Sequence, residues 1–387
     1  MPDRLLKVLV VLGTRPEAIK LAPVISRLRH DRSSFRVRVC VTAQHRQMLD
    51  QVLGIFRITP DIDMDLMRAD QDLFDVSTGV IGGMRRILLA EKPDAVVVQG
   101  DTTTAFAAAL AAFYLRIPVA HVEAGLRTQN KYSPFPEEGN RRLLSVLADF
   151  HFAPTEGARQ NLVASGVAAE KIWVTGNTVI DALRMIRRRL RAPQAQKHWL
   201  EYFRQSFDLE LDEEKQRIIL VTGHRRENFG RGLRQICLAL REIVRRDPRV
   251  RVIYPVHLNP NVQKPVRAIL RGLPRVCLIE PLAYEPFVFL MGRAHLILTD
   301  SGGIQEEAPA LGKPVLVMRR ETERPEGVLS GGVRLVGTER QAIVRQVLEL
   351  LRDGESYRRM ARVANPYGDG RAAQRIAAVL ASGLGGS

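Results

Sequence analysis

Short, almost wholly apolar runs alternate with amphipathic stretches along this chain, and the alternation limits the folds that it can adopt. Six apolar runs of β character occupy the first half: Leu6–Leu12, Arg36–Val41, Ala95–Gln99, Pro118–Val122, Phe150–Ala153 and Lys171–Val174. Six more follow in the second half: Arg217–Val221, Arg251–Pro255, Arg275–Ile279, Leu296–Thr299, Pro314–Val317 and Val333–Val336. Strands that are apolar on both faces are typical of parallel sheets covered by helices on both sides. The pattern predicts an α/β protein with two doubly wound, Rossmann-like domains.

The stretches between the predicted strands have helical patterns, of which the clearest are 18–29, 46–53, 103–116 and 141–147. At 387 residues the chain is long enough for two cores of ordinary size. We place a linker near Asn177–Pro193 and predict one domain at 1–177 and a second at 178–370. A last helix, expected at Arg371–Leu380, could pack on either domain, and we assign 371–387 to the first.

The net charge of +16 raises the question of nucleic-acid binding. Nine of the 58 basic residues are lysines and the rest are arginines spread along the whole chain, with one dense run at 187–191 in the predicted linker. The sequence contains no helix-turn-helix, zinc-finger or RNP signature, and aromatic residues make up only 6%. We therefore expect no nucleic-acid partner, and we expect part of the charge to serve a polyanionic small molecule.

Membrane and targeting signals are missing from the sequence as well. No apolar run approaches the roughly 20 residues that span a bilayer, and residues 5–12 lead directly into a loop without a signal-peptide cleavage site. Cys40, Cys237 and Cys277 are odd in number, far apart and set in apolar runs, without metal-ligand spacing. We expect three buried thiols, no membrane contact and a reducing compartment, the cytoplasm.

The stretch from Gln99 to Arg142 places carboxylates just after two apolar runs, among glycine, proline and threonine. These carboxylates are Asp101, Glu123, Glu137 and Glu138. Carboxylates at the ends of buried strands are costly to desolvate unless they are hydrogen-bonded or used, so together they predict an active site built from several loops. Each also has an ordinary interpretation: Asp101 could cap the helix expected near Thr103, and Glu138 could be a first-turn acid.

Two further segments combine a strand end, a glycine turn and a helix start. In residues 299–307, TDSGGIQEE, free amides at the helix N-terminus suit a phosphate, although Ser301 could be a simple N-cap. Glu307, one turn into the helix, is placed to hold a ribose diol. Residues 13–17, GTRPE, repeat the geometry, with Arg15 placed to meet an anion. Neither a GxGxxG nor a Walker motif is present, so NAD and ATP are not favoured.

Cations accompany these turns. Residues 223–228, GHRREN, bring His224 and two arginines to a strand end, and Arg324 lies in the later segment TERPE. Residues 223–228 could instead be a solvated loop. Taken together, the cations, the glycine-rich helix start and the lack of a DxD-like metal motif predict a nucleoside diphosphate bound without obligatory Mg²⁺. The carboxylates Asp101, Glu123 and Glu137 would then act on the group that the diphosphate carries.

The motifs also support a resemblance that spans almost the whole chain. GTRPEAIKLAP, TAQHRQMLDQV, GDTTT, HVEAGLRT, SPFPEE, GNTVIDAL, TGHRREN, YPVHLNPNV, TDSGGIQEEAP, LGKPVLVMR, TERPE and NPYGDG occur in this order. In them the sequence resembles the bacterial non-hydrolysing UDP-N-acetylglucosamine 2-epimerases. The resemblance implies a GT-B type of fold, with two Rossmann-like domains around a cleft, that interconverts UDP-GlcNAc and UDP-ManNAc. It also implies a cytosolic homodimer that uses neither NAD nor an essential metal.

The resemblance assigns roles to individual residues. It implies an active site of Arg15, Lys20, Asp101, Glu123, Glu137 and His224. It implies that the uridine diphosphate is held by Phe287, Ser301, Gly302, Gly303, Glu307 and Arg324. Residues matching those that bind a second, activating substrate molecule in relatives are Gln44, Gln47, Gln71 and His257. Asp70 stands where some relatives have arginine, and this difference affects the inferred regulation. Leu282 stands where some relatives have glutamine, and this difference affects one inferred contact with uracil.

The substrate suggests the chemistry. Because the hydrogen on sugar C2 is not next to a carbonyl, we expect UDP to leave C1 first, which makes the C2 proton labile. Loss of that proton gives 2-acetamidoglucal. Protonation of C2 on the other face and return of UDP then give the epimer, UDP-ManNAc, which we expect to supply ManNAc units for a bacterial cell-surface polysaccharide. The alternatives are a hydrolysing 2-epimerase that releases ManNAc and UDP, a GT-B glycosyltransferase, and a nucleic-acid-binding protein.

Overall fold

The computed structural model describes residues 5–42, 46–66, 71–128, 130–212 and 216–385. The chain divides into two compact units: unit 1 comprises Met1–Arg184 and Tyr367–Ser387, and unit 2 comprises Met185–Pro366. The domain limits inferred above, at 177 and 370, stay a prediction, and the contact-based division lies at 184 and 366. The segment that was expected to be a linker contains a helix, α7 (Thr178–Leu190), which carries the chain from unit 1 into unit 2.

Unit 1 contains a parallel sheet in the order β3-β2-β1-β4-β5-β6-β7. Its strands are β1 (Leu6–Leu12), β2 (Phe35–Val41), β3 (Ile62–Asp63), β4 (Ala95–Gln99), β5 (Val119–Val122), β6 (Phe150–Ala153) and β7 (Ile172–Val174). The six predicted strands are present within a residue at each end. The sequence analysis missed β3, which is an edge strand of two residues and too short to show an apolar pattern.

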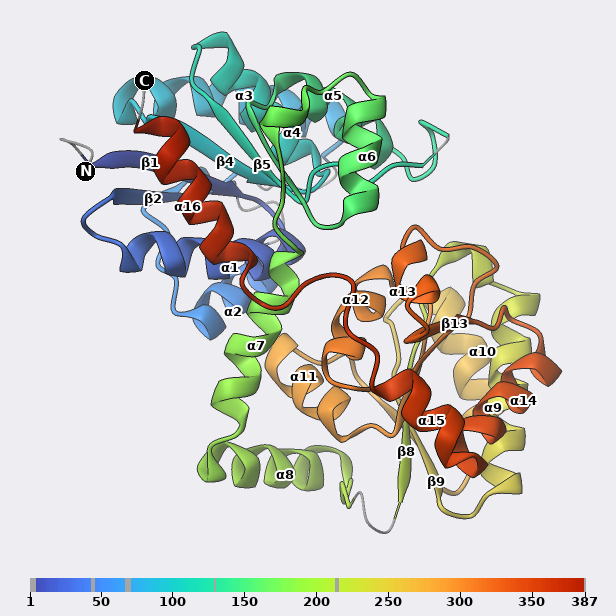
Figure 1. Ribbon diagram of the computed structural model, residues 1–387. Coiled ribbons are helices and arrows are strands. Elements are labelled where there is room, and N and C mark those ends of the chain that lie inside the picture. Colours follow the sequence, from blue (N-terminus) through green and yellow to red (C-terminus); the bar gives the residue numbers. More distant parts are fainter. Residues whose placement is uncertain (1–4, 43–45, 67–70, 129, 213–215, 386–387) are drawn as a thin grey trace. The chain divides into compact units, whose positions relative to one another are not determined.

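Helices cover both faces of this sheet (Figure 1). Helices α3, α4 and α5 pack together on one face, and α1, α2 and α16 on the other. The helices of unit 1 are α1 (Arg15–His30), α2 (Arg46–Phe56), α3 (Leu73–Glu91), α4 (Thr103–Tyr114), α5 (Glu137–Leu147), α6 (Glu156–Ala164) and α16 (Ala372–Leu384), with a 3₁₀ turn at Ala169–Lys171. The alanine-rich face of α4 is buried because its small side chains let the helix approach the sheet closely.

The last helix, α16, belongs to unit 1. Asp181 at the start of α7 accepts hydrogen bonds from the backbone amides of Ala372, at 3.2 Å, and Ala373, at 2.9 Å. These bonds satisfy amides that a helix N-terminus otherwise leaves unpaired. Helix α16 also packs along α1, which joins the two chain segments of unit 1.

Unit 2 is built around a parallel sheet in the order β10-β9-β8-β11-β12-β13. Its strands are β8 (Arg217–Thr222), β9 (Val250–Pro255), β10 (Val276–Ile279), β11 (Leu296–Thr299), β12 (Val315–Val317) and β13 (Val333–Leu335). Its helices are α8 (Pro193–Phe207), α9 (Arg231–Arg246), α10 (Pro260–Leu270), α11 (Tyr284–Arg293), α12 (Gly302–Ala310), α13 (Pro325–Leu329), α14 (Arg340–Arg352) and α15 (Gly354–Ala361), with a 3₁₀ turn at Arg226–Asn228. Helices α9, α10 and α14 pack together and bury the apolar side of α9.

Both sheets reverse their strand order once, between β1 and β4 in unit 1 and between β8 and β11 in unit 2. In open α/β sheets, ligands bind outside the carboxyl ends of the strands at such reversals. The predicted two doubly wound sheets are therefore confirmed, and the reversals mark where a site is expected in each unit.

Cys40 and Cys237 are buried free thiols as predicted, whereas Cys277 is only half-buried. Burial raises the pKa of Cys40 and of Cys237 to about 12, so both stay protonated thiols. Among the described helices, none is both long and apolar enough to cross a membrane.

Candidate active site

The loops that follow β1 and β4 are tied together by a buried carboxylate, Glu17. One of its oxygens accepts hydrogen bonds from the amides of Gly13, at 3.0 Å, and Thr14, at 2.7 Å, and the other accepts the Thr102 hydroxyl at 2.6 Å. Burial raises the pKa of Glu17, and these hydrogen bonds partly oppose the rise. Glu17 thus fixes the turn that presents Arg15, whose side chain is exposed. Glu17 belongs to the GTRPE motif, from which its role could not be predicted.

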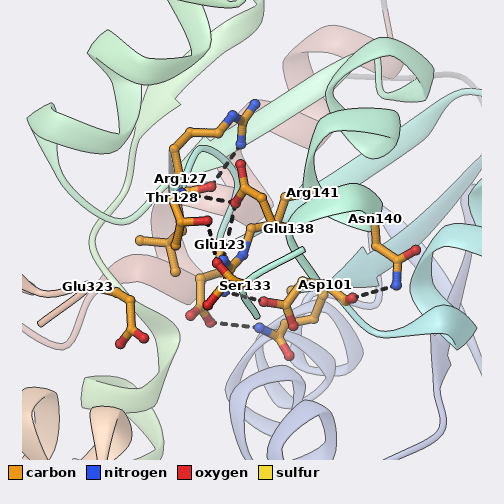
Figure 2. A network of polar contacts seen from close by, with 12 residues as sticks. Asp101, Glu123, Arg127, Thr128, Ser133, Glu138, Asn140, Arg141 and Glu323 are labelled. Atoms are coloured by element: carbon orange, nitrogen blue, oxygen red, sulfur yellow. Dashed lines mark hydrogen bonds and ion pairs between the residues drawn. The ribbon is translucent and has the colours of Figure 1, made fainter. Parts of the chain in front are cut away.

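Asp101 lies two residues after the end of β4 and contacts helix α5. One of its carboxylate oxygens lies 2.6 Å from the guanidinium of Arg141, and its carbonyl accepts a hydrogen bond from the Asn140 side chain at 2.9 Å (Figure 2). The cap of α4 is Thr102, whose hydroxyl accepts the amide of Ala105, so the alternative role of Asp101 as that cap is wrong. Asp101 keeps 26% of its side chain exposed, which leaves it accessible to a ligand.

Glu123 follows β5 in a left-handed backbone conformation, with φ of 64°. A residue with a Cβ adopts this region at a cost of about 1–2 kcal/mol, so the surrounding contacts must hold it there. Its carboxylate accepts a hydrogen bond from Gln99 at 2.6 Å and forms an ion pair with Lys20. Only 5% of its side chain is exposed. The structure therefore places Lys20 and Glu123 together, and it adds Gln99, which could have been noticed as the one polar residue that ends β4.

Neighbouring Glu137 and Glu138 at the start of α5 have different surroundings. The Glu138 side chain is fully buried and accepts a hydrogen bond from the Thr128 amide at 3.0 Å (Figure 2). It also accepts one from Arg142 at 2.9 Å. Glu138 thus fixes the loop before α5, in agreement with its ordinary interpretation as a helix first-turn acid. Glu137 is half-buried, and its Oε2 is buried without a hydrogen-bond partner among the described residues. A buried carboxylate oxygen without a hydrogen-bond partner is uncommon in folded proteins.

In unit 2 a single carboxylate, Asp300, organises the loop after β8. It is 1% exposed and accepts hydrogen bonds from the backbone amides of His224 and Arg225, each at 2.9 Å, and from the Asn228 side chain at 3.1 Å. The His224 ring nitrogen Nδ1 lies 3.3 Å from the same carboxylate. Asp300 follows β11, so it joins the two loops at the strand reversal. The sequence analysis placed His224 here without recognising this support.

The SGG turn after β11 begins helix α12 at Gly302. A Cβ on Gly302 would lie 3.0 Å from the guanidinium of Arg324, a tight contact that Arg324 could relieve only by shifting, so glycine favours this close approach. Arg324 is held by Glu306 at 2.8 Å and by Glu323 at 3.4 Å. Burial would raise the pKa of Glu323, but hydrogen bonds and charge from Arg319, with the charge of Arg324, lower it to about 2. Ser301 is at the N-cap position, but its side chain makes no capping hydrogen bond, so the alternative interpretation of Ser301 as a simple N-cap is wrong.

Glu307 lies one turn into α12, as predicted, and is 9% exposed. Its carboxylate accepts the hydroxyl of Tyr284 at 2.9 Å. Burial, together with the Glu307 charge, raises the pKa of Tyr284 well above its usual range, so Tyr284 remains a hydrogen-bond donor. Phe287 lies one turn along α11 from Tyr284 and is half-buried. Phe287, Glu307, Ser301, Gly302, Gly303 and Arg324 thus come from neighbouring elements of unit 2.

The residues matched to a second substrate molecule are only partly described. The rings of His257 and His224 are stacked with centroids 5.7 Å apart, so His257 adjoins the candidate site of unit 2. The Gln71 side chain, in unit 1, donates to the Leu66 carbonyl at 2.8 Å. Gln44 and Asp70 lie outside the described residues, as does the side chain of Gln47. Within the described ranges, no cluster of three or more histidine, cysteine, aspartate or glutamate residues could hold a metal ion.

Comparisons with known proteins identify the family. The sequence matches the family described as UDP-N-acetylglucosamine 2-epimerase over residues 27–381. The UDP-N-acetylglucosamine 2-epimerase of Yersinia pestis is 56% identical over 381 residues, which cover 97% of this chain and 98% of that protein. A crystal structure of UDP-GlcNAc 2-epimerase from Neisseria meningitidis bound to UDP-GlcNAc is 50% identical, with a TM-score of 0.90, and covers 97% of this chain and 100% of that one.

A more distant structure supports the same assignment. The UDP-GlcNAc 2-epimerase of Methanocaldococcus jannaschii, in complex with UDP-GlcNAc and UDP, is 32% identical with a TM-score of 0.79 over 97% of this chain and 100% of that one. The predicted GT-B-like fold, with two Rossmann-like sheets, is confirmed by these neighbours. The chain belongs to the UDP-N-acetylglucosamine 2-epimerase family.

Proposed function

We propose that this protein is a UDP-GlcNAc 2-epimerase that interconverts UDP-GlcNAc and UDP-ManNAc without hydrolysing them. One observation carries the proposal: the strand reversal of unit 1 gathers carboxylates, and that of unit 2 gathers cations beside a glycine-rich helix start. Relatives with bound UDP-GlcNAc and UDP support the choice of substrate.

In the proposed reaction, the C1–O bond breaks first and UDP leaves with the bonding electron pair. Arg15, His224 and the amides of Gly302 and Gly303 would stabilise the charge that develops on the diphosphate. The Ser301 amide donates to the Thr299 hydroxyl at 2.9 Å. Glu307 would accept hydrogen bonds from ribose hydroxyls, Phe287 would contact the uracil, and Arg324 would bind the phosphates. Departure of UDP leaves an oxocarbenium ion, whose C2 proton is acidic.

A carboxylate then removes the C2 proton, and the C–H electrons form the C1=C2 bond of 2-acetamidoglucal. Protonation of C2 from the opposite face and attack of UDP on C1 complete the inversion. Asp101, Glu123 and Glu137 are the proposed proton-transfer group. Their surroundings differ: Arg141 faces Asp101, Lys20 faces Glu123, and Glu137 keeps a buried oxygen without a partner among the described residues. Such differences suit two carboxylates with opposite roles.

The reaction as proposed is redox-neutral overall and needs neither NAD nor a metal. We infer a cytoplasmic enzyme, as the three free cysteines suggest, that supplies ManNAc units for a cell-surface polysaccharide. Binding of a second UDP-GlcNAc near His257 would activate it.

We also infer a homodimer. Large apolar side chains are exposed at the end of α4 and on α5, two helices that pack against each other. They are Phe113, Tyr114, Leu143 and Val146, with exposed fractions of 54%, 66%, 49% and 82%. An exposed apolar patch of this kind is typical of a protein–protein interface, and a second copy is the proposed occupant. Val146→Glu should shift the molecular mass measured by light scattering from dimer to monomer, whereas the exposed Val163→Glu on α6 should leave the dimer intact.

Product analysis tests the proposed function directly. Purified protein is incubated with UDP-GlcNAc, without NAD or added metal, and nucleotide sugars are separated by anion-exchange chromatography. We expect UDP-ManNAc to accumulate to a stable ratio with UDP-GlcNAc. Stoichiometric UDP and free ManNAc would instead indicate the hydrolysing alternative, and turnover only with an added sugar acceptor would indicate a glycosyltransferase.

A further inference from the structure

The amino ends of the strands in unit 2 border a second basic, concave surface, which the proposed reaction does not use. Two adjoining cavities form it, and we call them together the basal groove. The first, of about 280 Å³, lies among α7, α8 and α11 and includes Arg187 and Arg191. The second, of about 350 Å³, lies beside α15 and includes Arg217 and Arg358. Arg293 and Lys313 line both cavities (Figure 1 labels these helices).

The basal groove is at the opposite sheet edge from the candidate nucleotide site. Arg217 is the first residue of β8, His295 directly precedes β11, and Lys313 lies two residues before β12. Ser301 and His224 instead follow the carboxyl ends of β11 and β8. Because β11 has four residues, at about 3.3 Å per residue the two edges are roughly 13 Å apart. A ligand in the groove would therefore be separate from the proposed UDP-sugar.

The charge of the groove is positive. Six arginine and lysine residues line its two cavities, and neither lining includes an aspartate or glutamate among the described residues. Arg293 at its centre is fixed in place: it donates to Gln196 at 2.5 Å, and its guanidinium lies 5.3 Å from the centre of the Phe289 ring. Phe289 stacks in turn on Phe203 of α8. A guanidinium held in this way loses less entropy when it binds an anion.

Two uncharged acceptors complete the lining. The Nε2 of His295 and the Oε1 of Gln216 are buried without hydrogen-bond partners in the described part of the chain. Burial, with the charges of Arg217 and Lys313, lowers the pKa of His295 to about 4, so the ring is neutral at pH 7. Because the ring already has a hydrogen bond to the Leu350 backbone carbonyl, its Nε2 is left as an acceptor. Buried acceptors normally have a hydrogen-bond donor, and a ligand hydroxyl could provide one here.

We propose that the basal groove is a second binding site, and that it takes a small phosphorylated molecule with free hydroxyl groups, such as a sugar phosphate or a nucleotide. The central Arg293 and Lys313 would bind the phosphate, and His295 and Gln216 would accept hydrogen bonds from the hydroxyls. The cavity of about 350 Å³ lies within the usual range for small-molecule sites, which starts at about 300 Å³, and the adjoining cavity of about 280 Å³ extends it.

Calorimetric titration with ribose 5-phosphate tests the proposal. The protein is first saturated with UDP, so that the proposed nucleotide site is occupied. We expect wild-type protein to bind ribose 5-phosphate under these conditions, more tightly than inorganic phosphate or ribose. Lys313→Gln should weaken binding at least tenfold. Arg187→Ala should weaken it by a smaller factor, whereas the neighbouring, exposed Arg188→Ala, which lines neither cavity, should match the wild type.

Arg187 and Arg188 are both exposed on α7, so neither substitution threatens the fold, and circular dichroism checks the Lys313 variant. Absence of ribose 5-phosphate binding by the UDP-saturated wild type would overturn the proposal. Equal affinities for Lys313→Gln, Arg187→Ala and Arg188→Ala would overturn it too. Inorganic phosphate binding as tightly as ribose 5-phosphate would contradict the role of the two hydroxyl acceptors.

Discussion

The two sheets each reverse their strand order once, but the carboxylates that follow their strands have different partners. In unit 1, the loops after β4 and β5 present Asp101 and Glu123, each paired with a cation. In unit 2, buried Asp300 holds the loop that presents His224 and Arg225, and Glu323 helps to hold Arg324. The carboxylates of unit 1 are thus proposed to react, whereas those of unit 2 serve to position cations.

This difference suggests a division of work between the two units. Proton transfer needs carboxylates whose pKa values are set by burial and neighbours, which the paired acids of unit 1 provide. Binding a leaving diphosphate needs fixed cations and the amides of a helix N-terminus, and unit 2 has both in Arg324 and the start of α12. Substitution of the unit 1 carboxylates should therefore lower kcat, whereas substitution of the cations, in unit 2 and at Arg15 of unit 1, should weaken UDP binding.

The largest effects are expected for the carboxylates of unit 1. Asp101→Asn, Glu123→Gln and Glu137→Gln should each lower kcat at least about 10²-fold, since general acid–base groups contribute at this level. The affinity for UDP, measured by calorimetry, should stay within about threefold of the wild type. Glu156→Gln, an exposed first-turn acid of α6, is the control. Near-normal turnover of any one variant would remove that residue from the proton-transfer group.

For Glu323 of unit 2, we expect an effect on the free energy of unfolding that depends on pH. Its pKa in the folded protein is about 2, against about 4.5 for an ordinary glutamate, so ionised Glu323 stabilises the fold above pH 4.5 and this contribution disappears as the pH falls to 2. Glu323→Gln should lower the free energy of unfolding by about 2 kcal/mol at most at neutral pH. The difference from wild type, measured by urea unfolding, should shrink toward pH 2. Exposed Glu321→Gln is the control, and a pH-independent difference would contradict this role.

The contribution of a single cation to UDP binding should be smaller, because several positive groups are proposed to share the diphosphate charge. Arg15→Ala should weaken UDP binding about tenfold, with little change in thermal stability, since its side chain is exposed. Exposed Arg27→Ala, further along the same helix, should bind UDP like the wild type. If the Arg15 and Arg27 variants had equal UDP affinities, Arg15 would not be a phosphate ligand.

The smallest effect concerns regulation. His257→Ala should flatten a sigmoidal dependence of rate on UDP-GlcNAc and leave kcat at saturating substrate within about threefold, because His257 is proposed to bind only the activating molecule. The control is His198→Ala, in an exposed part of α8. The two variants are compared by measuring initial rates over a wide range of UDP-GlcNAc concentration. A sigmoidal curve that persists in the His257 variant would argue against a second site there.

Much of this arrangement could be predicted from the order of apolar runs. Because polar residues follow strand ends, the sequence indicated that Asp101, Glu123, His224 and Ser301 lie at sheet edges. The sequence could not show which side chains meet, since Gln99 with Glu123 and Arg141 with Asp101 come from different elements. The segment of α7 was predicted to be a linker because its run of arginines made it look polar. The helix nevertheless has a buried apolar face that includes Ile186 and Leu190.

Isotope exchange during turnover tests the central claim, elimination and re-addition of UDP, most directly. The protein is incubated with UDP-GlcNAc in D₂O, without NAD or metal, and C2 is followed by proton NMR. The account predicts UDP-ManNAc with deuterium at C2 and little free ManNAc. UDP-ManNAc that retains the original hydrogen at C2 would contradict proton removal by the carboxylates of unit 1.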